Sequence, residues 1–117
     1  MIELELPFPP SVNHYYRRVG PRTLISRQGR AYRNHVCSAL VGLGVRTMTG
    51  PLRVDVEAYP PDRRQRDSDN LLKALLDALE HGGAYVNDSQ VQDLHIRMLS
   101  PVKGGMVLVR LEKINAT

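Results

Sequence analysis

Between residues 63 and 73 the chain reads Arg-Arg-Gln-Arg-Asp-Ser-Asp-Asn-Leu-Leu-Lys, so three arginines stand directly before two aspartates and a lysine. Arginine suits phosphate oxygens because its planar guanidinium presents a fork of donors. Paired carboxylates suit a hard divalent cation such as Mg²⁺, which binds oxygen ligands and keeps other positions for water or phosphate. This juxtaposition predicts a site where a phosphodiester is held and then cut.

The two aspartates, Asp67 and Asp69, lie where a loop meets a predicted helix. Side chains two residues apart diverge on a helix, but in an extended or turning segment they can point to one ion. Lys73 lies four residues after Asp69 on the same helical face, and Asn70 is a candidate for hydrogen bonds to the metal ligands. The other interpretation is helix capping, in which early acidic and polar residues satisfy free backbone N–H groups.

A third carboxylate is available at Asp88, in the turn formed by residues 87–89. Asn-Asp-Ser is also ordinary turn chemistry, so both interpretations of Asp88 stand at this stage. The four histidines show no spacing typical of a metal site, and His14 is a candidate DNA contact in a basic loop. Because Cys37 is the single cysteine, an internal disulfide is excluded. A reducing, cytoplasmic location is therefore expected for the protein.

Charge is distributed unevenly along the chain. The net charge is +4, yet no Asp or Glu occurs between Leu6 and Val54. A long segment of one sign attracts polyanions, which predicts nucleic-acid binding. The alternative is a genome composition that favours scattered surface arginines. The candidate phosphate contacts are Arg17, Arg18, Arg27, Arg30 and Arg33, together with Arg63, Arg64 and Arg66.

The elements that must position these residues form one α+β domain over residues 1–117. Apolar periodicity predicts two main helices, at residues 28–43 with Ser26 as the N-cap and at residues 69–80. They are expected to pack on a mixed sheet of about four strands. Alternation predicts these strands at residues 2–6, 52–58, 94–98 and 106–113, with a further short strand at residues 23–26. The turn at residues 103–105 predicts an antiparallel hairpin between the last two strands.

Composition narrows the classes of function. Aromatic residues make up only 5% of the chain and there is no Trp, so stacking of side chains on many bases is not expected to be its main way of binding nucleic acid. No stretch approaches the roughly 20 apolar residues of a membrane span. A Gly-rich phosphate loop and a nucleophile elbow are both missing from the sequence, so no organic cofactor is expected.

Three segments carry a resemblance to a known family. Residues 9–17 read Pro-Pro-Ser-Val-Asn-His-Tyr-Tyr-Arg, residues 61–71 read Pro-Asp-Arg-Arg-Gln-Arg-Asp-Ser-Asp-Asn-Leu before Lys73, and residues 87–91 read Asn-Asp-Ser-Gln-Val. This order resembles the RusA family of Holliday-junction resolvases over nearly the whole chain. The Asp-x-Asp-Asn-Leu-x-Lys core with a later Asp is its specific part. Asn87 stands where family members can carry a second acid.

The resemblance implies a homodimeric, Mg²⁺-dependent endonuclease that binds four-way DNA junctions and nicks two opposed strands symmetrically. Mn²⁺ is an expected substitute for Mg²⁺. Asp67, Asp69 and Asp88 match the family's catalytic carboxylates, and Lys73 matches its essential lysine. A prophage origin is also in keeping with the family. Two other functions are considered: a basic nucleic-acid-binding protein without catalysis, and a metal-dependent nuclease acting on flaps or plain duplexes.

Overall fold

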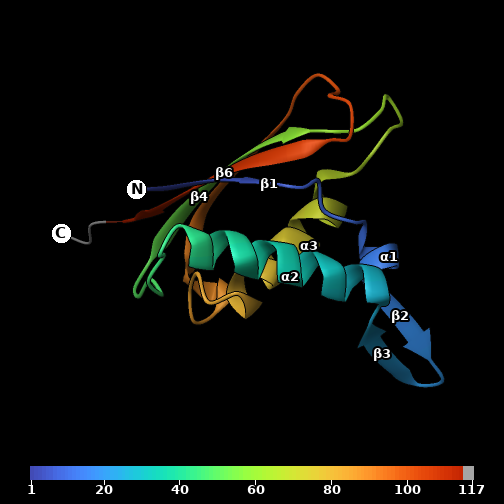
Figure 1. The fold of residues 1–117 in the computed structure, drawn as a ribbon, viewed down its shortest axis with the longest axis horizontal. Helices are drawn as coiled ribbons and strands as arrows, with labels where there is room; N and C mark the ends of the chain where they lie inside the picture. The colour runs from blue at the N-terminus through green and yellow to red at the C-terminus, as the bar shows by residue number, and fades with distance from the viewer. Residues whose placement is uncertain (115–117) are drawn as a thin grey trace.

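The computed structural model describes residues 1–114 as one α+β layer structure, in which the two long helices cover a single face of the main sheet (Figure 1). Those helices are α2 (Arg27–Gly42) and α3 (Ser68–His81). The strands of the main sheet are β1 (Ile2–Leu6), β4 (Leu52–Tyr59), β5 (Val91–Met98) and β6 (Met106–Lys113). The predicted fold class is confirmed.

Strand order in the main sheet is β1-β6-β4-β5, with β4 and β5 parallel and the other neighbours antiparallel. The β4–α3–β5 connection is a crossover, which parallel neighbours require because a tight turn cannot join them. The predicted hairpin between the last two strands is therefore wrong. β4 lies between β5 and β6 and pairs with both of them.

The reason for this correction lies in burial. Every second residue of β4 is buried against the helices, and the same is true of β6, so pairing these two strands places their apolar faces in one core. β5 is largely exposed and takes the sheet edge. Its continuation crosses the end of β4, where the Leu99 amide donates to the Ala58 carbonyl and the Val102 amide to the Pro60 carbonyl. The Gly104-Gly105 turn then returns the chain along the far side of β4.

The core lies between the helices and the sheet. Its apolar side chains come from both layers, with fully buried residues on β4, α3 and β6 that include Val54, Val56, Leu75, Leu79, Val109 and Leu111. Ser26 caps α2 as expected, because its hydroxyl accepts a bond from the Gly29 amide at 2.9 Å. Within residues 1–114, no helix is long and apolar enough to cross a bilayer.

Residues 11–20 contain regular structure. The basic loop that contains His14 forms the short helix α1 (Val12–Tyr15) and the strand β2 (Tyr16–Val19), and β2 pairs with β3 (Arg22–Ile25) in a separate two-stranded ribbon. Gly20 provides the positive φ of 59° that the tight turn needs. The β2–β3 hairpin projects from the body of the molecule beyond the start of α2 (Figure 1).

Candidate nuclease site

Asp67 and Asp69 lie at the start of α3. Asp67 occupies the N-cap position with extended backbone angles, but its side chain makes no capping hydrogen bond. The carboxylates of Asp67 and Asp69 are both exposed, and the N-terminal end of a helix stabilises negative charge. The capping interpretation thus fails for the Asp67 side chain, and both carboxylates stay available as oxygen ligands. Asn70 is exposed in the same turn.

Lys73 follows one helical turn after Asp69 and is exposed on the same face of α3. Its ammonium nitrogen lies 5.6 Å from the centre of the Tyr16 ring, a cation–π contact. Tyr16 begins strand β2, so this contact joins the base of the hairpin to the predicted site. The two aspartates and the lysine are therefore all exposed at the start of α3, with Lys73 one turn from Asp69.

Asp88 lies at the opposite end of α3. It begins the short 3₁₀ helix η1 (Asp88–Gln90), and its amide donates to Glu80 Oε1 at 2.7 Å. Asn87 caps η1 in a reciprocal box with Gln90. Since a helix rises about 1.5 Å per residue, Asp69 and Glu80 are separated by about 16 Å along the axis. No cluster of three metal-ligating side chains forms within residues 1–114 of a single chain.

The loop before α3 is organised by Asp62. Its carboxylate accepts from Arg66 at 2.8 Å and Arg64 at 3.3 Å, and also from the Arg64 amide at 2.9 Å. The hydrogen bond from that amide, followed by the one from Arg66, lowers the pKa of Asp62 from 3.8 to about 2. Arg66 also donates to two loop carbonyls and lies over the Phe8 ring, so its role here is to close the loop. Arg63 and Arg64 point to solvent.

A second group of cations lies on the hairpin and at the start of α2. Arg17, Arg18, Arg27 and Arg30 are all exposed, and none of them pairs with a carboxylate within residues 1–114. His14 shares a hydrogen bond of 2.8 Å with the Ser11 hydroxyl and lines a cavity of about 790 Å³. Asp67 stands in the wall of this same cavity. The cavity wall thus brings His14, Arg64 and Arg66 together with one of the two carboxylates, that of Asp67.

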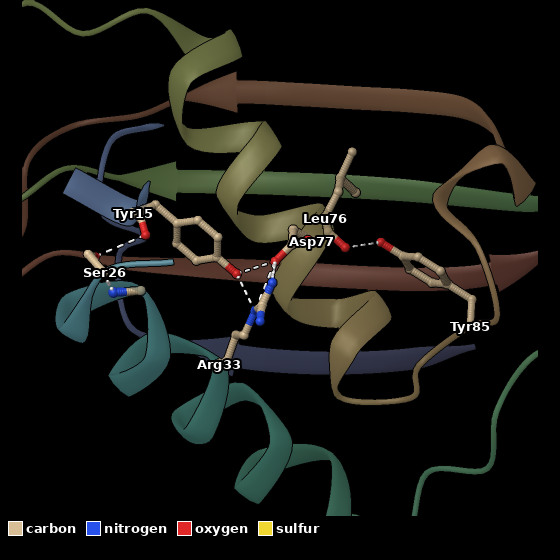
Figure 2. A network of polar contacts seen from close by, with 7 residues as sticks. Tyr15, Ser26, Arg33, Leu76, Asp77 and Tyr85 are labelled. Carbon is tan, nitrogen blue, oxygen red and sulfur yellow. Dashed lines mark hydrogen bonds and ion pairs between the residues drawn. The ribbon is translucent and has the colours of Figure 1, made fainter. Parts of the chain in front are cut away.

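Arg33, a predicted phosphate contact, is instead engaged inside the protein (Figure 2). Its guanidinium bonds Asp77 Oδ2 of α3 at 2.8 and 3.1 Å and the Tyr15 hydroxyl at 3.0 Å, and only 22% of its side chain is exposed. Tyr15 itself donates to Asp77, and burial raises the pKa of the Tyr15 hydroxyl. This network ties α2, α3 and α1 together beneath the candidate site.

Sequence reasoning missed Tyr15, Tyr16 and Asp77 as members of the site's support. Asp77 lies one turn beyond Lys73, which is the only sequence signal that connects it with the site. The Arg33–Asp77 pair spans two helices that are distant in the sequence, so no local pattern announces it.

A carboxylate pair with a lysine, set in a basic surface, defines a class: the layout is typical of phosphodiester-cleaving nucleases. The family model "Endodeoxyribonuclease RusA" matches residues 7–112, and the chain belongs to that family. It is 41% identical over 106 residues to the crossover junction endodeoxyribonuclease RusA of Escherichia coli strain K12, covering 87% of this chain and 86% of that protein. The enzyme of the same name from Enterobacteria phage 82 is 42% identical over 103 residues, with the same coverage of 87% and 86%. That of Escherichia coli O139:H28 is 36% identical over 115 residues, covering 95% and 93%.

Proposed function

We propose that this protein is a structure-selective endonuclease that binds four-way DNA junctions as a homodimer and resolves them by symmetric, Mg²⁺-dependent cleavage. One observation carries the proposal. Asp67, Asp69 and Lys73 are all exposed at the start of α3, and Lys73 lines a groove together with Arg17 and Arg18, which pair with no carboxylate of residues 1–114. The relatives named crossover junction endodeoxyribonucleases supply the substrate class.

Dimerisation follows from the position of Asp88. A single chain holds Asp88 at one end of α3 and the aspartate pair at the other. In a two-fold dimer with the α3 helices antiparallel, each helix start faces the partner's helix end. Such an interface uses the same patch on both subunits. It would bring Asp88 of one subunit to Asp67 and Asp69 of the other, and so form two equivalent sites.

The flank of α3 that is turned away from α2 suits this packing. Asp77 faces Arg33 of α2, and Leu72 and Leu76 lie on the other side of the helix, where both are partly exposed. The neighbouring edge strand adds Leu94 and Met98, which are 40% and 39% exposed although their partners on β4 are buried. Residues 74–75 lie midway between Asp69 and Glu80. A two-fold axis near Leu72 and Leu76 would therefore bring the start of each α3 helix opposite the end of its partner's α3 helix.

The donor set fits Mg²⁺. Asp67, Asp69 and the partner subunit's Asp88 would supply carboxylate oxygens, the ligands that this ion takes with water and phosphate completing its shell. When bound, the metal supplies an activated water and neutralises charge on the phosphate. Mn²⁺ accepts the same oxygen ligands and is a substitute. Asn70 hydrogen-bonds the ligands or the water around them.

The chain's own cations hold the DNA. Lys73 places its ammonium beside the phosphate to be cut, where it stabilises developing negative charge. Arg63 and Arg64, with Arg17 and Arg18 and the cations at the start of α2, contact backbone phosphates without reading sequence. A junction presents two equivalent strands about a two-fold axis, and the dimer presents two equivalent sites to them. The protein then acts on cytoplasmic DNA, and the phage relative favours a prophage origin.

The test uses a synthetic four-way junction and a linear duplex of matching sequence. With Mg²⁺ the junction should be nicked in two opposed strands, and the duplex should survive. Chelation by EDTA should stop cleavage while binding continues. Binding without cleavage in Mg²⁺ or Mn²⁺ would instead identify a non-catalytic junction-binding protein, and equal cleavage of the duplex or of flaps would identify a less selective nuclease.

A further inference from the structure

A groove of about 610 Å³ lies between the β2–β3 hairpin and α3, away from the cavity that contains Asp67 in its wall. Its lining includes Tyr16, Arg17, Arg18 and Thr23 of the hairpin and Lys73 of α3. Among residues 1–114, no acidic side chain lines it. Lys73 therefore lies one turn from Asp69 along its own helix and also in the wall of this basic groove.

Tyr16 contacts the Lys73 side chain at the groove. The Lys73 ammonium lies over the Tyr16 ring at 5.6 Å. The Tyr16 ring meets Tyr15 edge to face, with centroids 4.8 Å apart and planes at 80°. Tyr15 is fully buried, and its hydroxyl is held between Asp77 and Arg33 (Figure 2). The Lys73 side chain thus contacts Tyr16, which packs on Tyr15, and Tyr15 is in turn hydrogen-bonded to Asp77 and Arg33.

The hairpin supplies two further cations to the groove, Arg17 and Arg18. Arg18 stands opposite Thr23 in the hairpin register, and both residues line the groove. The next pair, Val19 and Arg22, belongs to the opposite face of the ribbon because side chains alternate along a strand. Arg18 and Arg22 are both exposed arginines on one hairpin, and only Arg18 lines the groove.

We propose that this groove binds a backbone phosphate of the DNA strand next to the bond that is cut, between Arg18 and Lys73, and that Tyr16 is the residue that positions Lys73 for cleavage. Two cations on facing elements match one phosphodiester, whose charge both can contact. The aromatic face holds the ammonium without a competing carboxylate. The inference deepens the proposed function and rests on it.

The Tyr16 arm of the test compares Tyr16→Phe with Tyr16→Leu in single-turnover cleavage of the junction. Leucine removes the ring face, and misplacing a reacting group slows chemistry, so we expect a rate about 30-fold lower. Junction affinity should stay within about threefold, because most phosphate contacts persist. Phenylalanine keeps the ring face, and its rate should lie within about threefold of the parent.

A purely structural role is separated by repeating Tyr16→Leu in a Lys73→Ala background. If Tyr16 acts through Lys73, the residual rate should change by less than about twofold. A similar loss in both backgrounds, or a Tyr16→Phe protein as slow as Tyr16→Leu, would overturn the positioning role. Melting temperatures of all variants are recorded, and Tyr16→Phe together with the Arg18 arm keeps the test decisive if the leucine variant is unstable.

The Arg18 arm compares Arg18→Gln with the matched control Arg22→Gln. Losing one phosphate contact should weaken junction binding several-fold and reduce the slope of log K against log salt by about 0.9. Arg22→Gln should leave both quantities close to the parent values. Equal effects of the two substitutions would show a general charge effect and contradict the groove. If the parent protein cleaves no junction at all, the proposed function itself fails; if it cleaves and the paired variants do not differ, only this inference fails.

Discussion

The two ends of helix α3 differ in what they hold. The start carries Asp67 and Asp69 in the open, with Lys73 one turn later and the basic hairpin beside it. The end carries Asp88, whose backbone amide donates a hydrogen bond to the Glu80 carboxylate and whose turn is capped by Asn87. Within residues 1–114 of one chain, neither end gathers three metal-ligating side chains. This difference supports the proposal that each end is half of a site, which two antiparallel copies of the helix would complete.

The largest expected effect comes from removing one carboxylate at either end. Asp69→Asn and Asp88→Asn should both lower junction cleavage by more than about 100-fold, since even residues that only support metal ligands cost 10–100-fold. Junction binding, measured by mobility shift, should persist because the arginines are intact. Asp55→Asn, on the outer face of β4, is the control. If Asp88→Asn keeps normal activity, the two ends are not halves of one site.

Breaking the interface should have the next largest effect. Leu94→Glu places a charge on the partly exposed apolar edge beside α3, where the dimer would desolvate it. Sedimentation should show monomers at concentrations where the parent is dimeric, and cleavage should fall at least about tenfold as the shared sites separate. Val41→Glu is the matched control, because Val41 is 72% exposed on α2, away from the proposed interface. Equal dimerisation of both variants would place the interface elsewhere.

The capping box at the end of α3 allows a finer test. Asn87→Ala removes the side chain that accepts from the Ser89 amide at 2.8 Å, at a cost of about 1 kcal/mol to the local turn. Asp88 is then less firmly placed, and cleavage should fall about tenfold with little change in melting temperature. Asn34→Ala on α2 serves as the control. Unchanged cleavage would show that the turn is not needed to position Asp88.

The smallest effect concerns acid stability at the start of α3. The pKa of Asp62 is depressed from 3.8 to about 2 by the Arg64 amide and by Arg66. A carboxylate with a depressed native pKa contributes stability above its unfolded pKa and loses it as the pH falls through the native value. Melting temperature should therefore decline between about pH 4 and pH 2, and the decline should be shallower in Asp62→Asn. Parallel curves for the two proteins would show that Asp62 does not contribute to the acid dependence of stability.

Much of this fold follows from local patterns. The alternation in β4 and the apolar periodicity of α3 predicted their boundaries to within about two residues, because burial on one face leaves a direct signature in sequence. Strand pairing did not follow. The Gly104-Gly105 turn correctly marked a reversal of the chain, but the partner of β6 was decided by the buried face of β4, which lies far away in sequence.

The site shows the same division. Asp67, Asp69 and Lys73 are close in sequence, and all three are exposed at the start of α3. Arg33 looked like one more surface cation, and only the packing of α2 against α3 pairs it with Asp77. Asp88 was grouped with the other aspartates through the family resemblance, whereas the length of α3 separates them within one chain. Contacts between subunits leave no local pattern, so the sequence could not indicate how that distance is bridged.

Mixing two inactive proteins tests the shared site most directly. Asp69→Asn and Asp88→Asn are combined under conditions in which subunits exchange, with exchange followed by native mass spectrometry. Each mixed dimer then has one site with both substitutions and one site with neither, so the account predicts that nicking of a single junction strand returns. A mixture of Asp67→Asn with Asp69→Asn should stay inactive, because every site keeps a defect. If the first mixture cleaves no junction although mixed dimers are present, a site built from two subunits is contradicted.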